Sequence, residues 1–313
     1  MREAGRVNPA KEEAFELANE IAHCPVMVQC LKGANLPCRD VVLAQWPKPW
    51  DDEEQTARRL YRWPLQHPLP VPWVGHIETS PLLFLSSNPA GGVVSADEPP
   101  YPPRPNERSP DVPERDPALY PSLRYPHAAP KWWWSHEGIN DHFDNQFYLW
   151  VDEEHRSRSK PGDKRRPPTL FWKKAHERAV QLFNTEDVTP GRHYAMTELV
   201  HCRSSGEAGV STRATKTCVD LYLARVLRLA REARTIVAYG KHANRVMRGL
   251  YPEPGRVTKP LEVEGLARRI VYLDHPAFRG TPTRELTREQ VEDLQEWIAS
   301  TPPSVWPSAE APA

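Results

Sequence analysis

The chain has 313 residues, 39% of them hydrophobic, which is enough for one large domain or two modest ones with an ordinary core. Its 41 lysines and arginines balance its 41 aspartates and glutamates, which excludes a general attraction to nucleic acid and leaves such binding to local patches. No apolar run reaches the roughly 18 residues of a membrane span, and the N-terminus lacks the apolar stretch of a signal peptide. We therefore expect a cytoplasmic protein that does not bind membranes.

The first part of the chain contains one predicted helix, an irregular arm and one predicted strand. Residues 10–23 place apolar side chains on one face, which predicts an amphipathic helix. Residues 45–80 are rich in Trp and Pro, so we expect an irregular arm. The apolar run from Leu82 to Leu85 ends in a polar, glycine-rich turn. A buried parallel strand ends in this way, and ligands bind at its carboxyl end.

Of the 35 prolines, 12 crowd into residues 89–130 and four into residues 301–312. Proline removes a backbone donor and disfavours regular structure, so both stretches are expected to be irregular. We predict a long Pro- and Trp-rich insertion at about 91–168 and a disordered tail at 301–313.

From residue 171 onward, helical and strand patterns alternate along the chain. The helices are expected at 171–183, 217–230, 241–250 and 284–299, the last of which begins at a threonine cap. The strands are expected at 193–202, 233–240 and 267–276. Such alternation is typical of a parallel sheet covered on both faces. The predicted fold class is therefore α/β: a single doubly wound domain over 1–300, with a central, mostly parallel sheet flanked by helices.

Polar turns follow the carboxyl ends of three predicted strands. They are Ser86-Ser87-Asn88-Pro89, Glu198 to Arg203, and Asp274-His275-Pro276. In a doubly wound sheet these ends lie at one edge, so the three turns converge on one crevice. Each turn alone also has a structural interpretation, such as a turn residue preceding a proline. Their order and strand context together indicate a functional site.

These motifs resemble those of the uracil-DNA glycosylase superfamily. SSNPAGG is similar to its first motif in the Asn-Pro form, and DHPAFRG to its closing His-Pro-Ser motif, with Ala277 where serine usually stands. The stretch TELVHCRSS and the Cys-led helix and apolar strand after it resemble the iron–sulfur branches, as do the N-terminal AHCPVMV and the aromatic arm. The match covers about 15–90 and 193–283 and leaves 91–168 largely without a counterpart.

The resemblance implies a monofunctional DNA glycosylase, which flips one base out of DNA, cuts its bond to the sugar and leaves an abasic site. His275, as a neutral imidazole, would donate a hydrogen bond to the base carbonyl O2, where negative charge develops. Asn88 would orient the attacking water, and Ser87 would contact the base. No obvious activated lysine stands in these motifs, so a lyase step is not expected.

Other residues are assigned to stacking on the base and to contact with DNA. Phe147 is expected to stack on the base, with Phe143 and residues 132–134 as alternatives and a core role as the competing interpretation. Phe278 would enter the space that the flipped nucleotide leaves, and Arg279 would contact phosphates or the minor groove; a core phenylalanine and a solvated arginine are the alternative. Arg203 is a further candidate for contact with DNA.

Glu198 departs from the family pattern, in which an asparagine at this position reads uracil. An ionised carboxylate only accepts hydrogen bonds, so it would repel uracil O4 and suit the amino group of cytosine. Because ordinary cytosine must be spared, we predict a modified cytosine in foreign DNA as the substrate. This resembles the phage-defence glycosylases of the superfamily, which remove bulky, glucosylated hydroxymethylcytosine from viral DNA. The alternative is that Glu198 is an outward-facing strand residue.

The five cysteines fall into two groups, Cys24, Cys30 and Cys38 near the N-terminus and Cys202 and Cys218 later in the chain. Disulfides are not expected in a reducing compartment. The resemblance implies a 4Fe–4S cluster on Cys24, Cys30, Cys202 and Cys218. Because the family's Cys-x-x-Cys is missing, Cys38 is an alternative to Cys30. Zinc on four thiolates and plain buried cysteines are the other interpretations. No nucleotide cofactor is expected.

Three other functions remain open at this point. The chain would excise uracil or another deaminated base in repair, or it would be a non-catalytic DNA-binding or sensing protein on the same fold. Ala277 favours the non-catalytic protein, whereas Asn88 and His275 argue against it. The third alternative is an adaptor protein that binds zinc through its cysteines and nucleic acid through the basic run 156–166. In the main interpretation the partner is DNA with an abnormal base, and the protein acts as a monomer.

Overall fold

The computed structural model describes residues 9–22, 24–31, 33–43, 70–87, 170–189, 191–202, 204, 207–275 and 285–300. The helices are α1 (Pro9–Ala22), α2 (Pro25–Leu31), α3 (Arg39–Leu43), α7 (Leu170–Phe183), α8 (Thr212–Cys218), α9 (Ala224–Leu229), α10 (Gly240–Leu250) and α11 (Arg288–Ser300), with a π-helical turn, η6 (Val219–Leu223), between α8 and α9. The strands are β1 (Trp73–Val74), β2 (Leu82–Ser86), β3 (Tyr194–Glu198), β4 (Thr235–Tyr239), β5 (Leu261–Val263) and β6 (Leu266–Leu273).

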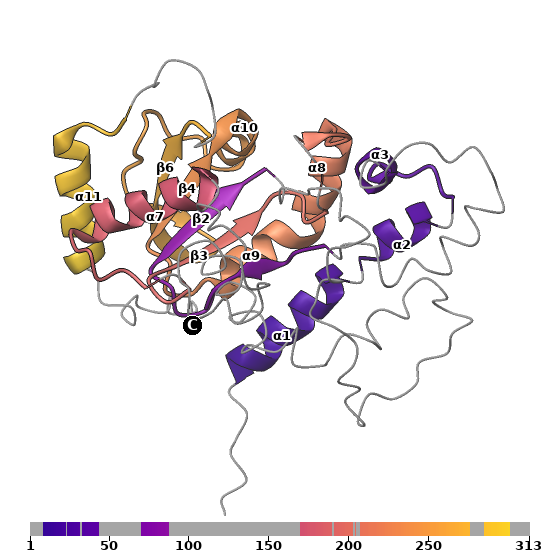
Figure 1. Ribbon diagram of the computed structural model, residues 1–313, viewed down its shortest axis with the longest axis horizontal. Coiled ribbons are helices and arrows are strands. Elements are labelled where there is room, and N and C mark those ends of the chain that lie inside the picture. The colour runs from indigo at the N-terminus through magenta and orange to yellow at the C-terminus, as the bar shows by residue number, and fades with distance from the viewer. Residues whose placement is uncertain are drawn as a thin grey trace, which may run out of the picture.

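The six strands form one mixed sheet in the order β1-β3-β2-β4-β6-β5. Figure 1 labels its four inner strands, β3, β2, β4 and β6. The four inner strands are parallel, whereas β1 and β5 pair antiparallel at the two edges. From β2 the chain passes to β3 on one side and later to β4 on the other side, so the strand order reverses at β2. Ligands of such sheets bind at the carboxyl ends of the strands beside this reversal. The α/β class with a mostly parallel sheet is confirmed.

Helices cover both faces of the sheet, because successive side chains of each strand point to opposite faces. Leu83 and Leu85 pack into one core with α1, α2, α3, α8, α9 and α10. Leu82 and Phe84 pack into the other core with α7 and α11. Figure 1 shows α7 and α11 on one side of the sheet and α1 and α9 on the other. All five residues of β2 and of β4 are buried, as is typical of inner parallel strands.

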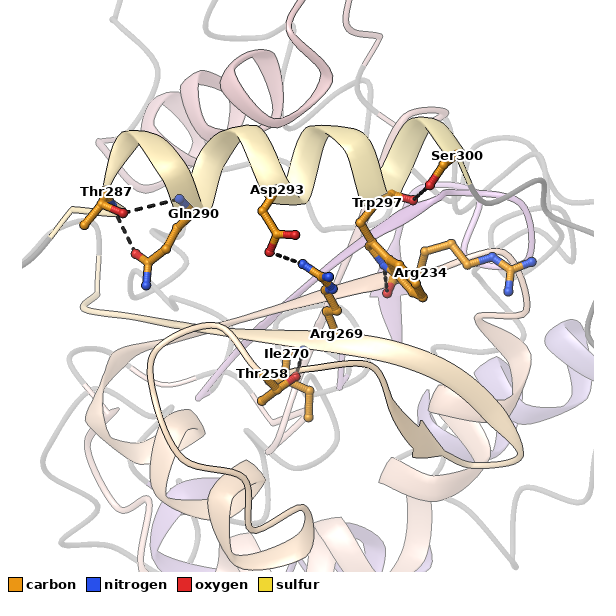
Figure 2. Close-up of polar contacts among 9 residues, drawn as sticks. All are labelled: Arg234, Thr258, Arg269, Ile270, Thr287, Gln290, Asp293, Trp297 and Ser300. Carbon is orange, nitrogen blue, oxygen red and sulfur yellow. Dashed lines mark hydrogen bonds and ion pairs between the residues drawn. The ribbon is translucent and has the colours of Figure 1, made fainter.

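Helix α11 begins at a side-chain cap, and two polar contacts attach the helix to the sheet (Figure 2). Thr287 Oγ1 accepts a hydrogen bond from the Gln290 main-chain nitrogen at 3.3 Å, and Gln290 Oε1 accepts one from the Thr287 nitrogen at 3.0 Å. This reciprocal cap confirms the predicted threonine start. Asp293 pairs with Arg269 of β6, and Trp297 Nε1 donates to the carbonyl just before β4 at 3.2 Å.

The periodic pattern of apolar residues predicted most of the longer helices and strands. The predicted strands correspond to β2, β3, β4 and β6, and the helices at 10–23, 171–183, 241–250 and 284–299 to α1, α7, α10 and α11. The helix predicted at 217–230 begins earlier, at Thr212, because Ser211 caps it by accepting from the Ala214 nitrogen at 3.1 Å. The short elements α2, α3, β1 and β5 were not predicted.

Two predicted regions, the insertion at 91–168 and the tail at 301–313, lie outside the described residues. Among the helices that the structure describes, none combines the length and the apolar character needed to cross a membrane.

Arg268 of β6 is fully buried and ties this strand to the end of α9. Its Nη2 donates to the carbonyls of Leu227 and Ala230, at 2.9 and 2.6 Å. These carbonyls belong to the last turn of the helix, where main-chain acceptors lack helical partners. Burial lowers the pKa of Arg268 to about 10, so the side chain stays charged at neutral pH. Within the described part of the chain its Nε and Nη1 have no hydrogen-bond partner.

Arg268→Ala is expected to lower the free energy of unfolding by about 3 kcal/mol or more, because the substitution leaves buried carbonyls unsatisfied and opens a cavity. Arg228→Ala is the matched control. Arg228 is exposed and pairs with Glu264 at 3.4 Å, so its loss should change stability by at most about 1 kcal/mol. Urea denaturation of both variants measures the difference. Equal, small effects would show that the buried guanidinium does not hold α9 to the sheet.

Candidate functional site

The carboxyl ends of the inner strands bring Ser87, Glu198 and His275 to one edge of the sheet. Pairing between β2 and β3 continues past the strands, since the nitrogens of Leu199 and Val200 donate to the carbonyls of Ser86 and Ser87 at 3.0 and 2.9 Å. Two strands, β2 and β4, separate β3 from β6. Glu198 and His275 therefore approach from backbones that are three strand spacings, about 14 Å, apart. That span suits a nucleobase held between two side chains.

Glu198 ends β3 with its carboxyl group turned away from solvent. The residue as a whole is half-buried, yet Oε2 has no contact with solvent and no hydrogen-bond partner among the described residues. Burial raises the pKa of Glu198 to about 8; a hydrogen bond from Ser86 opposes this rise, and the charge of Glu207 adds to it. At pH 7 the carboxyl group is therefore mostly protonated and donates as well as accepts hydrogen bonds. The ionised form considered from sequence is not the one that burial favours.

Glu207 is a member of this site that the sequence did not reveal. The Ser87 hydroxyl donates a hydrogen bond to Glu207 Oε1. The negative charge of Glu207 raises the pKa of Glu198 and of His275, so the carboxylate lies near both. Glu207 is exposed and belongs to the turn between β3 and α8. No motif marks this position, because only the folded turn brings it to Ser87.

His275 follows β6 and is held by contacts from two helices. Its ring stacks on Phe171 of α7, with centroids 5.4 Å apart and planes at 26°. On another side it packs against Gly240, where an added Cβ would lie 3.4 Å from the His275 Cβ. Asn244 of α10 donates to the carbonyl of the last β6 residue at 2.9 Å. Burial lowers the pKa of His275, and the charge of Glu207 partly offsets this, so the imidazole is neutral at pH 7.

The remaining predicted site residues lie outside the described part of the chain. They are Asn88, Phe147, Arg203, Phe278 and Arg279. Their roles stay predictions. The structure instead places Phe171, which the sequence assigned only to a helix, against the imidazole of His275. Little in the sequence indicates that Phe171 belongs to the site, because an aromatic residue at the start of an amphipathic helix is usually a core residue.

All five cysteines are buried and belong to one core cluster. No disulfide joins any of these five. Burial raises the pKa of the Cys202 thiol, and nearby Cys24, Cys218, Cys38 and Cys30 raise it further. The two groups that are far apart in sequence therefore meet in space. Among the described residues, no three His, Cys, Asp or Glu side chains are placed to hold a metal ion.

Comparisons with known proteins do not extend this picture: no family model and no curated protein matches the chain. The resemblance to the uracil-DNA glycosylase superfamily therefore rests on the motifs themselves and on the order of the strands that carry them.

Glu198→Gln is expected to stabilise the protein more at pH 8 than at pH 5. Between its ordinary pKa of 4.5 and the folded value of about 8, Glu198 loses its proton in the unfolded chain but keeps it in the folded protein. Raising the pH therefore favours unfolding of the unsubstituted protein, and this loss levels off above the folded pKa. Glutamine has no such linkage.

The difference in unfolding free energy between this variant and the unsubstituted protein should grow by roughly 3 kcal/mol from pH 5 to pH 8. Urea denaturation at the two pH values measures it. Glu262→Gln, at an exposed position of β5, is the matched control. A difference that does not change with pH would show that Glu198 is ionised in the folded protein.

Proposed function

We propose that the protein is a monofunctional DNA glycosylase that excises a modified cytosine and leaves an abasic site. The observation that carries the proposal is the meeting of Ser87, Glu198 and His275 at one edge of the sheet, with Glu198 Oε2 lacking a partner in the described part. A buried polar atom without a hydrogen bond costs about 1–3 kcal/mol. The edge of a flipped base would satisfy it, which makes base binding the natural use of this carboxyl group.

His275 acts on the leaving base. When the bond between the sugar and the base breaks, its electron pair goes to the base, and negative charge develops on the pyrimidine O2. A neutral imidazole donates a hydrogen bond to that oxygen and stabilises the charge as it forms. Burial keeps His275 neutral, and stacking on Phe171 fixes the plane of its ring. Asn88, by its place in the first motif, would orient the water.

Glu198 reads the opposite edge of the base. Its protonated carboxyl group can accept a hydrogen bond from the cytosine amino group N4 and donate one to N3. The same group can instead donate to O4 of uracil and accept from N3–H. The raised pKa of Glu198 therefore favours uracil excision as the second candidate. Sparing of ordinary cytosine then depends on contacts to the modification, for which we propose the insertion at 91–168.

We further propose that the cysteines hold a 4Fe–4S cluster, because iron–sulfur ligands are thiolates and five thiols gather in one core. Cys24 and Cys38 raise the pKa of both Cys202 and Cys218, whereas Cys30 raises the pKa of Cys202 but not that of Cys218. Cys24, Cys38, Cys202 and Cys218 are therefore the preferred ligands. A single zinc ion would need four thiolates about 2.3 Å from one centre, whereas a cluster is larger and spaces its ligands farther apart. Its contribution would be structural, joining the N-terminal helices to α8.

The cluster predicts iron and colour in the purified protein. Anaerobic preparations should be brown, show an absorption band at about 400 nm and contain iron and sulfide. Cys38→Ser should lose both colour and iron, whereas Cys30→Ser, which removes a buried thiol of the same core, should keep them. A colourless, metal-free preparation of the unsubstituted protein would rule out the cluster. Loss of iron in the Cys30 variant alone would restore that residue as a ligand.

The glycosylase proposal predicts base release from defined DNA. Duplexes that carry glucosylated hydroxymethylcytosine, cytosine or uracil are incubated with the protein and then treated with heat and alkali, which cut the strand at abasic sites. We expect scission at the modified cytosine alone. His275→Ala should lower the single-turnover rate by about 10²- to 10³-fold while DNA binding persists.

His193→Ala is the control for the histidine substitution, because His193 lies just before β3, at the opposite edge of the sheet. Its rate should equal that of the unsubstituted protein. Scission of the uracil strand alone would support the second candidate. Binding without scission of any strand would show a non-catalytic DNA-binding protein.

A further inference from the structure

Glu207 adopts a backbone conformation that is unfavourable for its residue type. Its φ is 63°, in the left-handed region that glycine and asparagine adopt most easily. Residues held in such conformations cluster at functional sites, where the surrounding structure maintains them. Glu264 has a similar φ in the turn between β5 and β6, so this conformation marks Glu207 only together with its hydrogen bond to Ser87.

The turn that carries Glu207 is fixed on two sides. The Ser87 hydroxyl donates to Glu207 Oε1, which joins the turn to the end of β2. Two residues on, Gly209 has a φ of 75° and packs against α3, where an added Cβ would lie 2.4 Å from the Asp40 carbonyl. Within the turn, the Val210 nitrogen donates to the Glu207 carbonyl at 3.0 Å. The carboxylate is thus held at the edge of the sheet while it remains exposed to water.

The two carboxyl groups of the site have different roles. Burial keeps the proton on Glu198, and the negative charge of Glu207 reinforces this. In the described part of the chain, Glu207 is the charged residue whose field acts on both Glu198 and His275. A buried, protonated carboxyl group beside a solvent-exposed carboxylate gives the site one group for each of two tasks. Glu198 suits recognition of the base, and Glu207 suits acceptance of a proton.

We propose that Glu207 is the catalytic base of this site and takes a proton from the water that attacks C1′ of the flipped nucleotide. The inference rests on the proposed glycosylase function. The bond from C1′ to the base breaks, and its electron pair leaves with the base. The water oxygen bonds to C1′ while one of its protons passes to the Glu207 carboxylate. The base anion, hydrogen-bonded by His275, is protonated by solvent, and Glu207 returns its proton to solvent.

A carboxylate accepts a proton far better than an amide does. Asn88, placed by its motif to orient the water, would therefore be complemented by Glu207. Ser87, which precedes Asn88 in the sequence, is hydrogen-bonded to Glu207. The first motif and the turn after β3 would thus supply orientation and basicity for the same water.

Glu207→Gln tests the base role directly, because the amide oxygen still accepts the Ser87 hydrogen bond but is a poor proton acceptor. On the DNA that the unsubstituted protein cleaves, its single-turnover rate should fall by about 10²-fold or more. DNA affinity should be equal or tighter, since a negative charge near the phosphates is removed. Glu207→Asn should lose activity equally while staying folded, because asparagine tolerates this φ.

Glu264→Asn is the matched control. Glu264 has a φ of 52° and lies in the turn between β5 and β6, at the other edge of the sheet. The single-turnover rate of the Glu264→Asn variant should equal that of the unsubstituted protein. A Glu207→Gln variant that is as fast as the unsubstituted protein would overturn the base role and leave the glycosylase proposal intact. An unsubstituted protein that releases no base from any of the DNAs would instead overturn the proposed function and this inference with it.

Discussion

The register between β2 and β3 is the constraint on which the site depends. It pairs Ser86 with Glu198, which allows the serine hydroxyl to hydrogen-bond to the glutamate carboxyl group. Because strand side chains alternate between faces, a slip of one residue would turn Glu198 toward the opposite core. The continuous apolar sequence of β2, buried along its whole length, does not fix this register by itself. The onward pairing of Leu199 and Val200 with the end of β2 does.

Much of the architecture could be predicted from the sequence, because long periodic segments determine it. The inner strands and the helices α7, α10 and α11 bury apolar faces that can be read directly from the chain. The edge strands β1 and β5 could not, since elements of two and three residues carry too little pattern. The convergence of three strand ends also followed from the topology of parallel sheets. Glu207 did not, because a left-handed turn rather than any periodicity brings it to Ser87.

Ionisation at this site is likewise a property of the fold rather than of residue type. The sequence position of Glu198 predicts an ionised carboxylate that only accepts hydrogen bonds. Enclosure of its carboxyl group reverses this and gives a neutral donor and acceptor beside a second, solvent-exposed carboxylate. His275 is held neutral by the same exclusion of water. In the described part of this edge, two neutral side chains thus lie near the negative charge of Glu207.

The close approach of Gly209 to Asp40 joins the N-terminal helices to the turn between β3 and α8. The segment that bears Cys24, Cys30 and Cys38 continues into α3. The backbone of the turn after β3 packs against α3 at Gly209. No side chain separates these two backbones, so a shift of α3 would displace the turn that carries Glu207.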